Sequence, residues 1–163
     1  MLKEARLYEE EVQRKHIESW DKPGNIYFCT VANSSLPIYD ENCCDARSLV
    51  SVDENDNVIG YIHYDLDLET KAASNFAIIS FNRGDCKFFT DVHKAVCDIF
   101  EKYKLNRLTW FCYAEHRAKY LYRRYIKEHG GKEYTKPGEV DELQDGKLHD
   151  RINFEIMADE FKV

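Results

Sequence analysis

The sequence of 163 residues lacks the features that place a protein in or across a membrane. It contains no run of eighteen or more apolar residues, which a membrane-spanning helix requires. Residues 1–6 carry Lys3, Glu4 and Arg6 where a secretory signal peptide would have its apolar stretch. We therefore expect a cytoplasmic protein that has no membrane partner.

An excess of basic residues is also missing. The chain has 23 lysines and arginines against 30 aspartates and glutamates, which gives a formal net charge of −7. Because nucleic-acid binding depends on a basic face that neutralises phosphates, we expect no nucleic-acid partner. The acidic balance suits a cationic ligand attracted over long range, and it also serves plain solubility.

The cysteines show no metal-binding or disulfide pattern. Neither Cys43 nor Cys44 belongs to a CxxC motif or lies beside a histidine pair, so no metal site is expected. The other four lie within or beside apolar segments, where a reduced cysteine acts as a small hydrophobe: Cys29, Cys86, Cys97 and Cys112. We predict six free thiols. A thiol-dependent enzyme that uses Cys112 or Cys43 and Cys44 is not expected, because no histidine can be tied to these cysteines.

Length and composition indicate a single domain over residues 1–163. Hydrophobic residues make up 44% and charged residues 33%, as in ordinary globular proteins. Residues 1–20 are expected to form an amphipathic helix that buries Tyr8, Val12, Ile17 and Trp20. Residues 25–31 suit either a short strand or a short helix, and 32–47 are polar and irregular.

The pattern becomes clearer from residue 48 onwards. Apolar residues at helical spacing predict helices over 91–103 and 115–129, the second burying Ala118, Leu121, Tyr122, Tyr125 and Ile126. Short β-branched and aromatic runs predict strands, of which 76–81 is apolar on both faces and therefore central. The predicted strands are 48–53, 58–65, 76–81, 107–113, 139–143 and 148–157. Turn-forming residues at 54–57 and 144–147 predict two hairpins.

This order of elements resembles the GCN5-related N-acetyltransferases over the last two thirds of the chain. The resemblance is carried by Val58–Ile62, by Ile78–Phe81 with the helix that follows, by Glu115–Tyr122, and by Leu143–Asp150. Its Asp-Gly hairpin is similar to that of members related to the ribosomal-protein-alanine acetyltransferases. The resemblance implies an α/β (α+β) fold with a central, mostly antiparallel mixed sheet of six to seven strands and about four helices. It also implies acetyl-CoA as co-substrate and a small-molecule or peptide amine as acceptor.

The turn between the central strand and its helix is the expected site for the diphosphate of coenzyme A. The free N–H groups of the helix point there, Gly84 can adopt a positive φ, and Arg83 and Lys87 add charge. Asp85 would repel phosphate unless it points outward or caps the helix. The family pattern Gln/Arg-x-x-Gly-x-Gly/Ala is met only in part, because Lys87 and Phe89 stand where the later glycines would be.

The resemblance also assigns residues to the rest of the coenzyme. The backbone of Ile79 and Phe81 is expected to pair with the pantetheine arm, in a gap beside the strand 109–113. Phe88 belongs to the expected diphosphate turn, and His116 stands where the family has an asparagine that contacts the coenzyme.

Tyr122 is the candidate catalytic residue, because a nearby phenol can protonate the departing thiolate. It also belongs to the apolar stripe of its helix, so a purely structural role is the alternative. The base that takes the proton of the amine is not identified. Glu115, His63 and Asp65 each lie near a strand or helix end where a water relay could begin.

Two further questions stay open at the level of sequence. The incomplete glycine pattern and the substituted asparagine also suit an inactive protein that keeps the fold as a binding module. A homodimer formed through a sheet edge is compatible with the pattern, which does not decide it.

Overall fold

The computed structural model describes residues 1–20, 35–40, 42–82, 84–143 and 145–163. The chain begins with β1 (Leu2–Glu4), the 3-10 helix η1 (Ala5–Tyr8) and α1 (Glu9–Trp20). The central elements follow as β2 (Ala46–Val52), β3 (Val58–Asp67), β4 (Ala72–Ser80), α2 (Cys86–Glu101), β5 (Arg107–Tyr113) and α3 (Ala118–His129). The last three strands are β6 (Lys132–Tyr134), β7 (Val140–Glu142) and β8 (Leu148–Met157).

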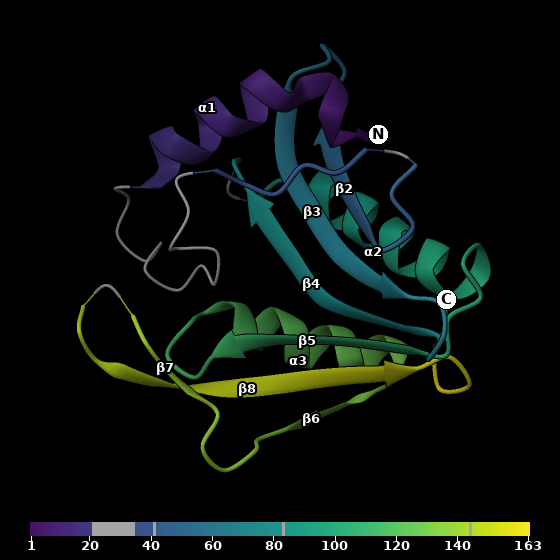
Figure 1. Cartoon of the computed structure of the whole chain (residues 1–163), viewed down its shortest axis with the longest axis vertical. Coiled ribbons are helices and arrows are strands. Elements are labelled where there is room, and N and C mark those ends of the chain that lie inside the picture. The colour runs from purple at the N-terminus through teal and green to yellow at the C-terminus, as the bar shows by residue number, and fades with distance from the viewer. Residues whose placement is uncertain (21–34, 41, 83, 144) are drawn as a thin grey trace.

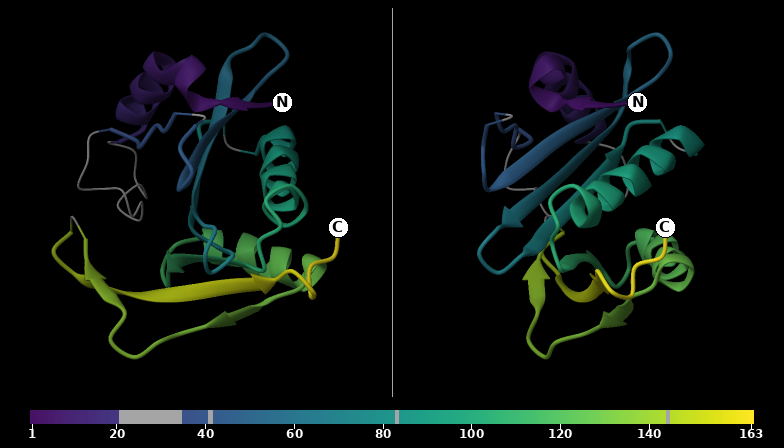
Figure 2. Two further views of the ribbon diagram at one scale, coloured as in Figure 1. Left: turned by 45° about the vertical axis from the view of Figure 1, so that its right-hand side comes forward. Right: turned by 90° about the vertical axis from the view of Figure 1, so that its right-hand side faces the viewer.

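The described residues form one mixed sheet of eight strands. Its order is β1-β2-β3-β4-β5-β8-β6, and β7 pairs with β8 off this path. All pairs are antiparallel except β4 with β5. Helix α1 covers one face of the β2–β4 half and α2 covers the other, while α3 lies along β5 and β8 (Figure 1 and Figure 2).

The predicted fold class is confirmed, although several boundaries move. The strand over 107–113 has the predicted bounds, and the central strand and the helix after it begin earlier than predicted, at Ala72 and Cys86. Both predicted hairpins form, between β2 and β3 and between β7 and β8. Strand β6 was not predicted, because Lys132–Tyr134 carries no apolar alternation. The prediction for residues 25–31 lies outside the described residues.

Two apolar clusters hold the helices to the sheet. The larger lies on the α2 face, where Ile62, Phe88 and Phe154 are fully buried. The smaller lies on the α1 face, where Val12 packs with residues of the sheet such as Val50 and Tyr61. Because successive residues of a strand point to opposite faces, the apolar stretches of β3 and β4 feed both clusters.

The predicted burial of α1 is only partly right. Val12 is buried, but Ile17 is 59% exposed, and the helix instead buries His16 and Ser19. These positions lie four and seven residues after Val12, so they share its face. Their polar side chains hid the true stripe from a search for apolar spacing.

The predicted burial of α3 is wrong in degree. No residue of this helix is fully buried, and Leu121 is 49% exposed. Tyr122, Tyr125 and Ile126 are half-buried and pack at the edge of the larger core. The helix leaves an open groove toward α2, so its apolar face covers the sheet only in part.

The cysteines within the described residues are free thiols, in agreement with the prediction for those positions: Cys43, Cys44, Cys86, Cys97 and Cys112. Cys29 lies outside the described residues. None of the helices in the described part of the chain is long and apolar enough to span a bilayer.

Gly60 provides a test of how α2 is seated on the sheet. A Cβ at this position would lie 2.2 Å from the ring of Phe88, which is fully buried against the strand. We expect Gly60→Ala to lower the free energy of unfolding by about 1–3 kcal/mol through overpacking, measured by urea denaturation. In a Phe88→Leu background the cost should shrink, because the side chain that clashes is smaller. An equal cost in both backgrounds would contradict the close packing of Phe88 on Gly60.

Candidate functional site

The sheet opens between its two central parallel strands. β4 and β5 pair only at Ala72–Arg107 and Ala73–Leu108, and beyond these pairs they diverge (Figure 1). Just past the last pair, the β3–β4 register shifts and Asn75 has a φ of +51°. An extra residue in one strand bends that strand, so this bulge turns β4 away from β5.

The divergence leaves backbone groups of β4 directed into the opening. The N–H of Phe81 donates to Ile59 O at 2.9 Å, which marks the bonded register between β3 and β4. Because bonding alternates along an antiparallel pair, Ile79 also bonds toward β3, whereas Ile78 and Ser80 point their N–H and C=O groups toward β5. The N–H and C=O groups of these two alternate residues can pair with an extended ligand that contains amide groups.

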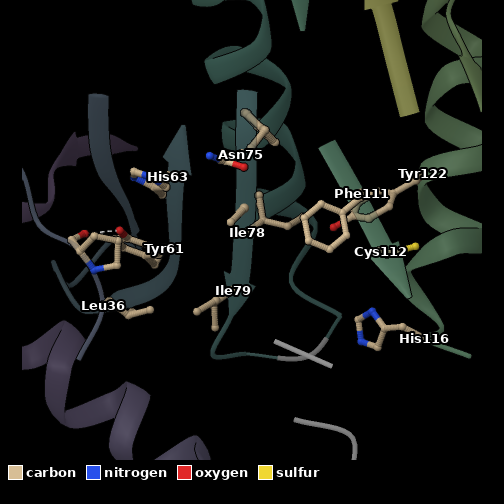
Figure 3. A pocket seen from close by; sticks show the side chains of 13 residues that line it. Leu36, Tyr61, His63, Asn75, Ile78, Ile79, Phe111, Cys112, His116 and Tyr122 are labelled. Atoms are coloured by element: carbon tan, nitrogen blue, oxygen red, sulfur yellow. Dashed lines mark hydrogen bonds between the residues drawn. The ribbon is translucent and has the colours of Figure 1, made fainter. Parts of the chain in front are cut away.

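A pocket of about 300 Å³ lies over this opening on the α1 face of the sheet. Figure 3 shows Tyr61 and His63 on one side of β4, and Phe111, His116 and Tyr122 on the other. Its remaining lining comes from Leu36, Pro37, Asn75, Phe76, Ala77, Ile78, Ile79 and Cys112. The lining is mainly apolar with a few polar side chains, as is usual for sites that bind small molecules.

A second pocket, of about 480 Å³, lies on the opposite face between α2 and α3. Phe89, His93 and Val96 from α2 and Leu121 and Tyr125 from α3 are among its lining residues. Phe76, Ile78 and Tyr122 line both pockets. The two pockets therefore adjoin each other at the opening between β4 and β5, one on each face of the sheet.

Tyr122 lies where these pockets meet. Its ring packs edge-on against Trp110 and Phe154, with centroids 5.9 and 5.4 Å away. The strands β5 and β8 thus fix the ring, and its position in both pocket linings leaves it within reach of a ligand in the opening. Tyr122 therefore packs against the core, as its place in the apolar stripe predicted, and also lines the pockets, as the proposed catalytic role requires.

Two histidines on the α1 face are neutral near pH 7. Burial lowers the pKa of His116, which precedes α3 and lines the first pocket. Burial likewise lowers the pKa of His63 on β3, where the carboxylate of Asp65 acts in the opposite direction. A neutral imidazole in a pocket can accept a proton.

The N-terminus of α2 differs from a simple anion cradle. Gly84 has a φ of +80° and open space around it, as predicted for a turn that an anion could approach. The carboxylate of Asp85, however, caps the helix and accepts the N–H of Lys87 at 2.9 Å. Phe88 is fully buried in the core, and Arg83 lies outside the described residues.

The structure thus brings together some of the predicted site residues. Ile79, His116 and Tyr122 share one pocket, while Gly84, Asp85 and Lys87 lie at the start of α2. The backbone of Ile79 and Phe81 faces β3, and the neighbours Ile78 and Ser80 face the opening instead. The sequence of a strand does not indicate which of its backbone groups point toward a given neighbouring strand. The sequence could therefore not show that Ile78 and Ser80, rather than Ile79 and Phe81, face the opening.

An ionic network holds the turn that carries His116. His149 on β8 lies 3.1 Å from Glu115 through Nδ1 and 3.1 Å from Asp145 through Nε2. The hydrogen bonds to Glu115 and then to Asp145 raise the pKa of His149. The bond to His149 lowers the pKa of the Glu115 carboxyl group, whereas the pKa of Asp145 is lowered first by the backbone N–H of Lys147 and further by His149. The imidazolium therefore ties the β7–β8 hairpin to the turn before α3.

Within the described residues, no group of three or more His, Cys, Asp or Glu side chains is arranged to hold a metal ion.

Comparison with solved structures identifies the architecture. A point mutant of spermidine N-acetyltransferase SpeG from Vibrio cholerae aligns with a TM-score of 0.61 and 18% identity, over 72% of this chain and 68% of that one. Spermidine/spermine N-acetyltransferase SpeG from Vibrio cholerae, solved with manganese ions, aligns with a TM-score of 0.58 and 20% identity over 72% and 68%. A crystal structure of a probable acetyltransferase aligns with a TM-score of 0.58 and 16% identity over 70% and 63%. The chain has the fold of the GCN5-related N-acetyltransferases.

The comparisons at the level of sequence add nothing to this result. No protein-family model matches the chain, and no curated protein matches it. The likeness therefore concerns the fold, and the arguments for activity depend on the site.

The His149 network predicts a pH-dependent stability. The pKa of His149 is raised above its unfolded value of about 6.5, so its ion pairs stabilise the fold below that pH. Their contribution is lost as the pH rises through the folded-state pKa. We expect His149→Gln to be more destabilising at pH 6 than at pH 9 in urea denaturation. A difference between variant and wild type that does not vary with pH would contradict the ion pairs.

Proposed function

We propose that this protein is an acetyl-CoA-dependent N-acetyltransferase that acts on a primary amine. The observation that carries the proposal is the opening between β4 and β5, beside which Tyr122 lies. Ile78 and Ser80 direct into it backbone groups that have no strand partner among the described residues. This arrangement suits a pantetheine arm, whose two amides need backbone partners and whose thioester needs a proton donor at sulfur.

The residues fit the coenzyme unevenly along its length. The opening offers backbone N–H and C=O groups and the apolar side chains of Phe76 and Ile78, which suit the pantetheine arm. The start of α2 offers a helix dipole, Gly84 and Lys87 for the diphosphate. There the Asp85 carboxylate already occupies one N–H, so a diphosphate must displace it or bind beside it.

The acceptor amine is proposed to enter through the pocket on the α1 face. The structural matches named as spermidine N-acetyltransferases act on a polyamine, which supports an amine acceptor here. A small molecule and a peptide amine both remain within the proposal, and the net charge of −7 favours a cationic one. The likeness of the β7–β8 hairpin to ribosomal-protein acetyltransferases, a cytoplasmic location and a homodimer stay predictions.

The proposed chemistry requires little from the protein beyond position and proton transfer. The thioester supplies an activated acyl group, and its C–S bond breaks as the N–C bond forms. The ammonium group loses two protons overall, one of which ends on sulfur through Tyr122 while the other is released. The N–H of Ile78 or Ser80 can donate to the carbonyl oxygen as its charge grows. Holding the two reactants together can contribute roughly 7–11 kcal/mol.

A binding module without turnover is the second candidate. It is favoured by the Asp85 cap, which places a negative charge where the diphosphate would bind. Stabilisation of the fold by acetyl-CoA, together with acetyl-CoA-dependent release of free thiol in the presence of amines, supports the enzyme. If millimolar acetyl-CoA produces neither stabilisation nor thiol release, this result would contradict the enzyme.

Tyr122→Phe tests the proton donor. We expect kcat to fall by about 10²-fold or more with little change in the KM for acetyl-CoA, because only the proton of the hydroxyl is removed. Tyr120→Phe is the matched control, since Tyr120 lies on the same helix with 63% of its surface exposed. Equal activities for the two variants in a thiol-release assay would exclude Tyr122 as the donor.

Asp85→Ser tests the diphosphate turn. Serine keeps a helix-capping oxygen but removes the carboxylate. We expect the affinity for coenzyme A to rise roughly three- to ten-fold, about 1 kcal/mol, while the affinity for pantetheine stays unchanged. Titration calorimetry measures both, with Asp159→Ser, in the exposed turn after β8, as the control for net charge. An equal change in the affinities for coenzyme A and for pantetheine would mean that the diphosphate does not bind beside Asp85.

A further inference from the structure

His63 and Asn75, which line the α1-face pocket, belong to a chain of hydrogen-bonded and ion-paired groups that runs across three strands. His63 on β3 has Nδ1 3.1 Å from the backbone oxygen of Arg47 on β2, and Nε2 3.1 Å from Asp65 Oδ1. Asp65 Oδ2 accepts a bond of 2.5 Å from the side-chain amide of Asn75 on β4. Tyr39 stacks on the imidazole, with ring centroids 5.5 Å apart. The ring is therefore fixed on all sides but the pocket.

The partners of the ring determine which nitrogen is available as a base. A backbone carbonyl can only accept a hydrogen bond, so Nδ1 of His63 carries the proton that Arg47 O receives. Burial lowers the pKa of this histidine and keeps the ring neutral near pH 7. Nε2 is then an acceptor that faces Asp65, which is also an acceptor when ionised. A cationic N–H donor that contacts both Nε2 and the Asp65 carboxylate would relieve the repulsion between these two acceptors, which lie 3.1 Å apart.

We propose that His63 and Asp65 form the subsite for the ammonium group of the acceptor, where Asp65 binds the charged nitrogen and Nε2 of His63 removes one of its protons. This inference rests on the proposed function and identifies the base that the proposed reaction needs. The N–H bond of the ammonium breaks, the proton forms the Nε2–H bond, and the electron pair stays on the amine nitrogen. Asp65 then faces the imidazolium and stabilises it.

The position of His63 in the sheet suits this role. Its partner across the β3–β4 ladder is Ala77, and opposite residues of an antiparallel pair share a face. Both line the pocket, and the methyl group of Ala77 leaves room between the imidazole and the opening. Ile78, the next residue, directs its N–H into that opening. Tyr122 lies across β4 from His63, so the amine and the leaving thiolate have separate proton-transfer groups (Figure 3).

The bulge at Asn75 connects the subsite to the opening. The left-handed conformation of Asn75 turns β4 away from β5 and also places its amide on Asp65. Two further titratable groups lie near the imidazole: Tyr39, which stacks on it, and Tyr61, which lines the same pocket. Tyr61 donates to the backbone oxygen of Pro37, and burial raises its pKa, so it is neutral across the working range. The guanidinium of Arg47 is directed to Tyr103 instead.

His63→Gln tests the base through the pH dependence of kcat/KM for n-butylamine, at saturating acetyl-CoA. Glutamine can keep the bond to Arg47 O but cannot take up a proton. The wild type should show a plateau from about pH 7, because the enzyme deprotonates the ammonium itself. The variant should instead rise about ten-fold per pH unit between pH 7 and 9, since it depends on free amine, whose pKa is about 10. Identical profiles would overturn the inference and leave the proposed function intact.

Asp65→Asn tests the binding of the charged nitrogen. We expect the KM for n-butylamine to rise about ten-fold while the affinity for coenzyme A is unchanged, and the acid limb of the profile to move to lower pH. Asp67→Asn removes a carboxylate from the exposed end of the same strand and should alter neither property. A KM unaffected by Asp65→Asn would overturn the assignment of the subsite.

A binding measurement keeps the inference testable if no acetyl transfer occurs. Histidine resonances of the wild type are followed by NMR as n-butylammonium is added. A bound cation should lower the pKa of His63, and Asp65→Asn should weaken the effect at least ten-fold. Absence of thiol release with this response intact would contradict the transferase while supporting the subsite. A His63 resonance that does not respond would overturn the subsite.

Discussion

The failure of β4 and β5 to pair beyond their first residues is the constraint on which the rest of the site depends. Within the described part of the chain, the divergence of these strands leaves backbone groups of β4 without a partner strand, and such groups are costly unless water or a ligand bonds them. The bulge at Asn75 causes the divergence, and the side chains of Phe76, Ile78 and Tyr122 surround it from both faces. The course of the backbone thus forms the opening, and the side chains only line it.

The groups around the opening divide the chemistry between the two halves of the sheet. β3 and β4 supply His63, Asp65 and the N–H groups that are directed into the opening, while α3 and the segment before it supply Tyr122 and His116. Each half is held by its own packing: Tyr122 against Trp110 and Phe154, and His63 between Tyr39 and the neighbouring strands. Acid and base groups can therefore act on opposite sides of one bound thioester without contacting each other.

The sequence predicted the order of strands and helices well, because burial leaves a periodic trace. Strand 107–113, the two hairpins and the central position of β4 all follow from such patterns. It predicted burial poorly where polar residues are enclosed, as at His16, or where an apolar helix face borders a groove, as at Leu121. Tyr122 was predicted from its spacing in a family motif and stays a prediction. The direction of the Ile78 and Ser80 amides depends on a tertiary bulge that no local pattern shows.

Hydrogen exchange at individual amides of β4 tests the central claim most directly. In the free protein, the amides of Ile78 and Ser80 should exchange much faster than those of Ile79 and Phe81, which bond to β3. Saturating acetyl-CoA should slow Ile78 and Ser80 selectively. Equal protection of all four amides in the free protein would mean that β4 and β5 are paired throughout, and it would contradict the account.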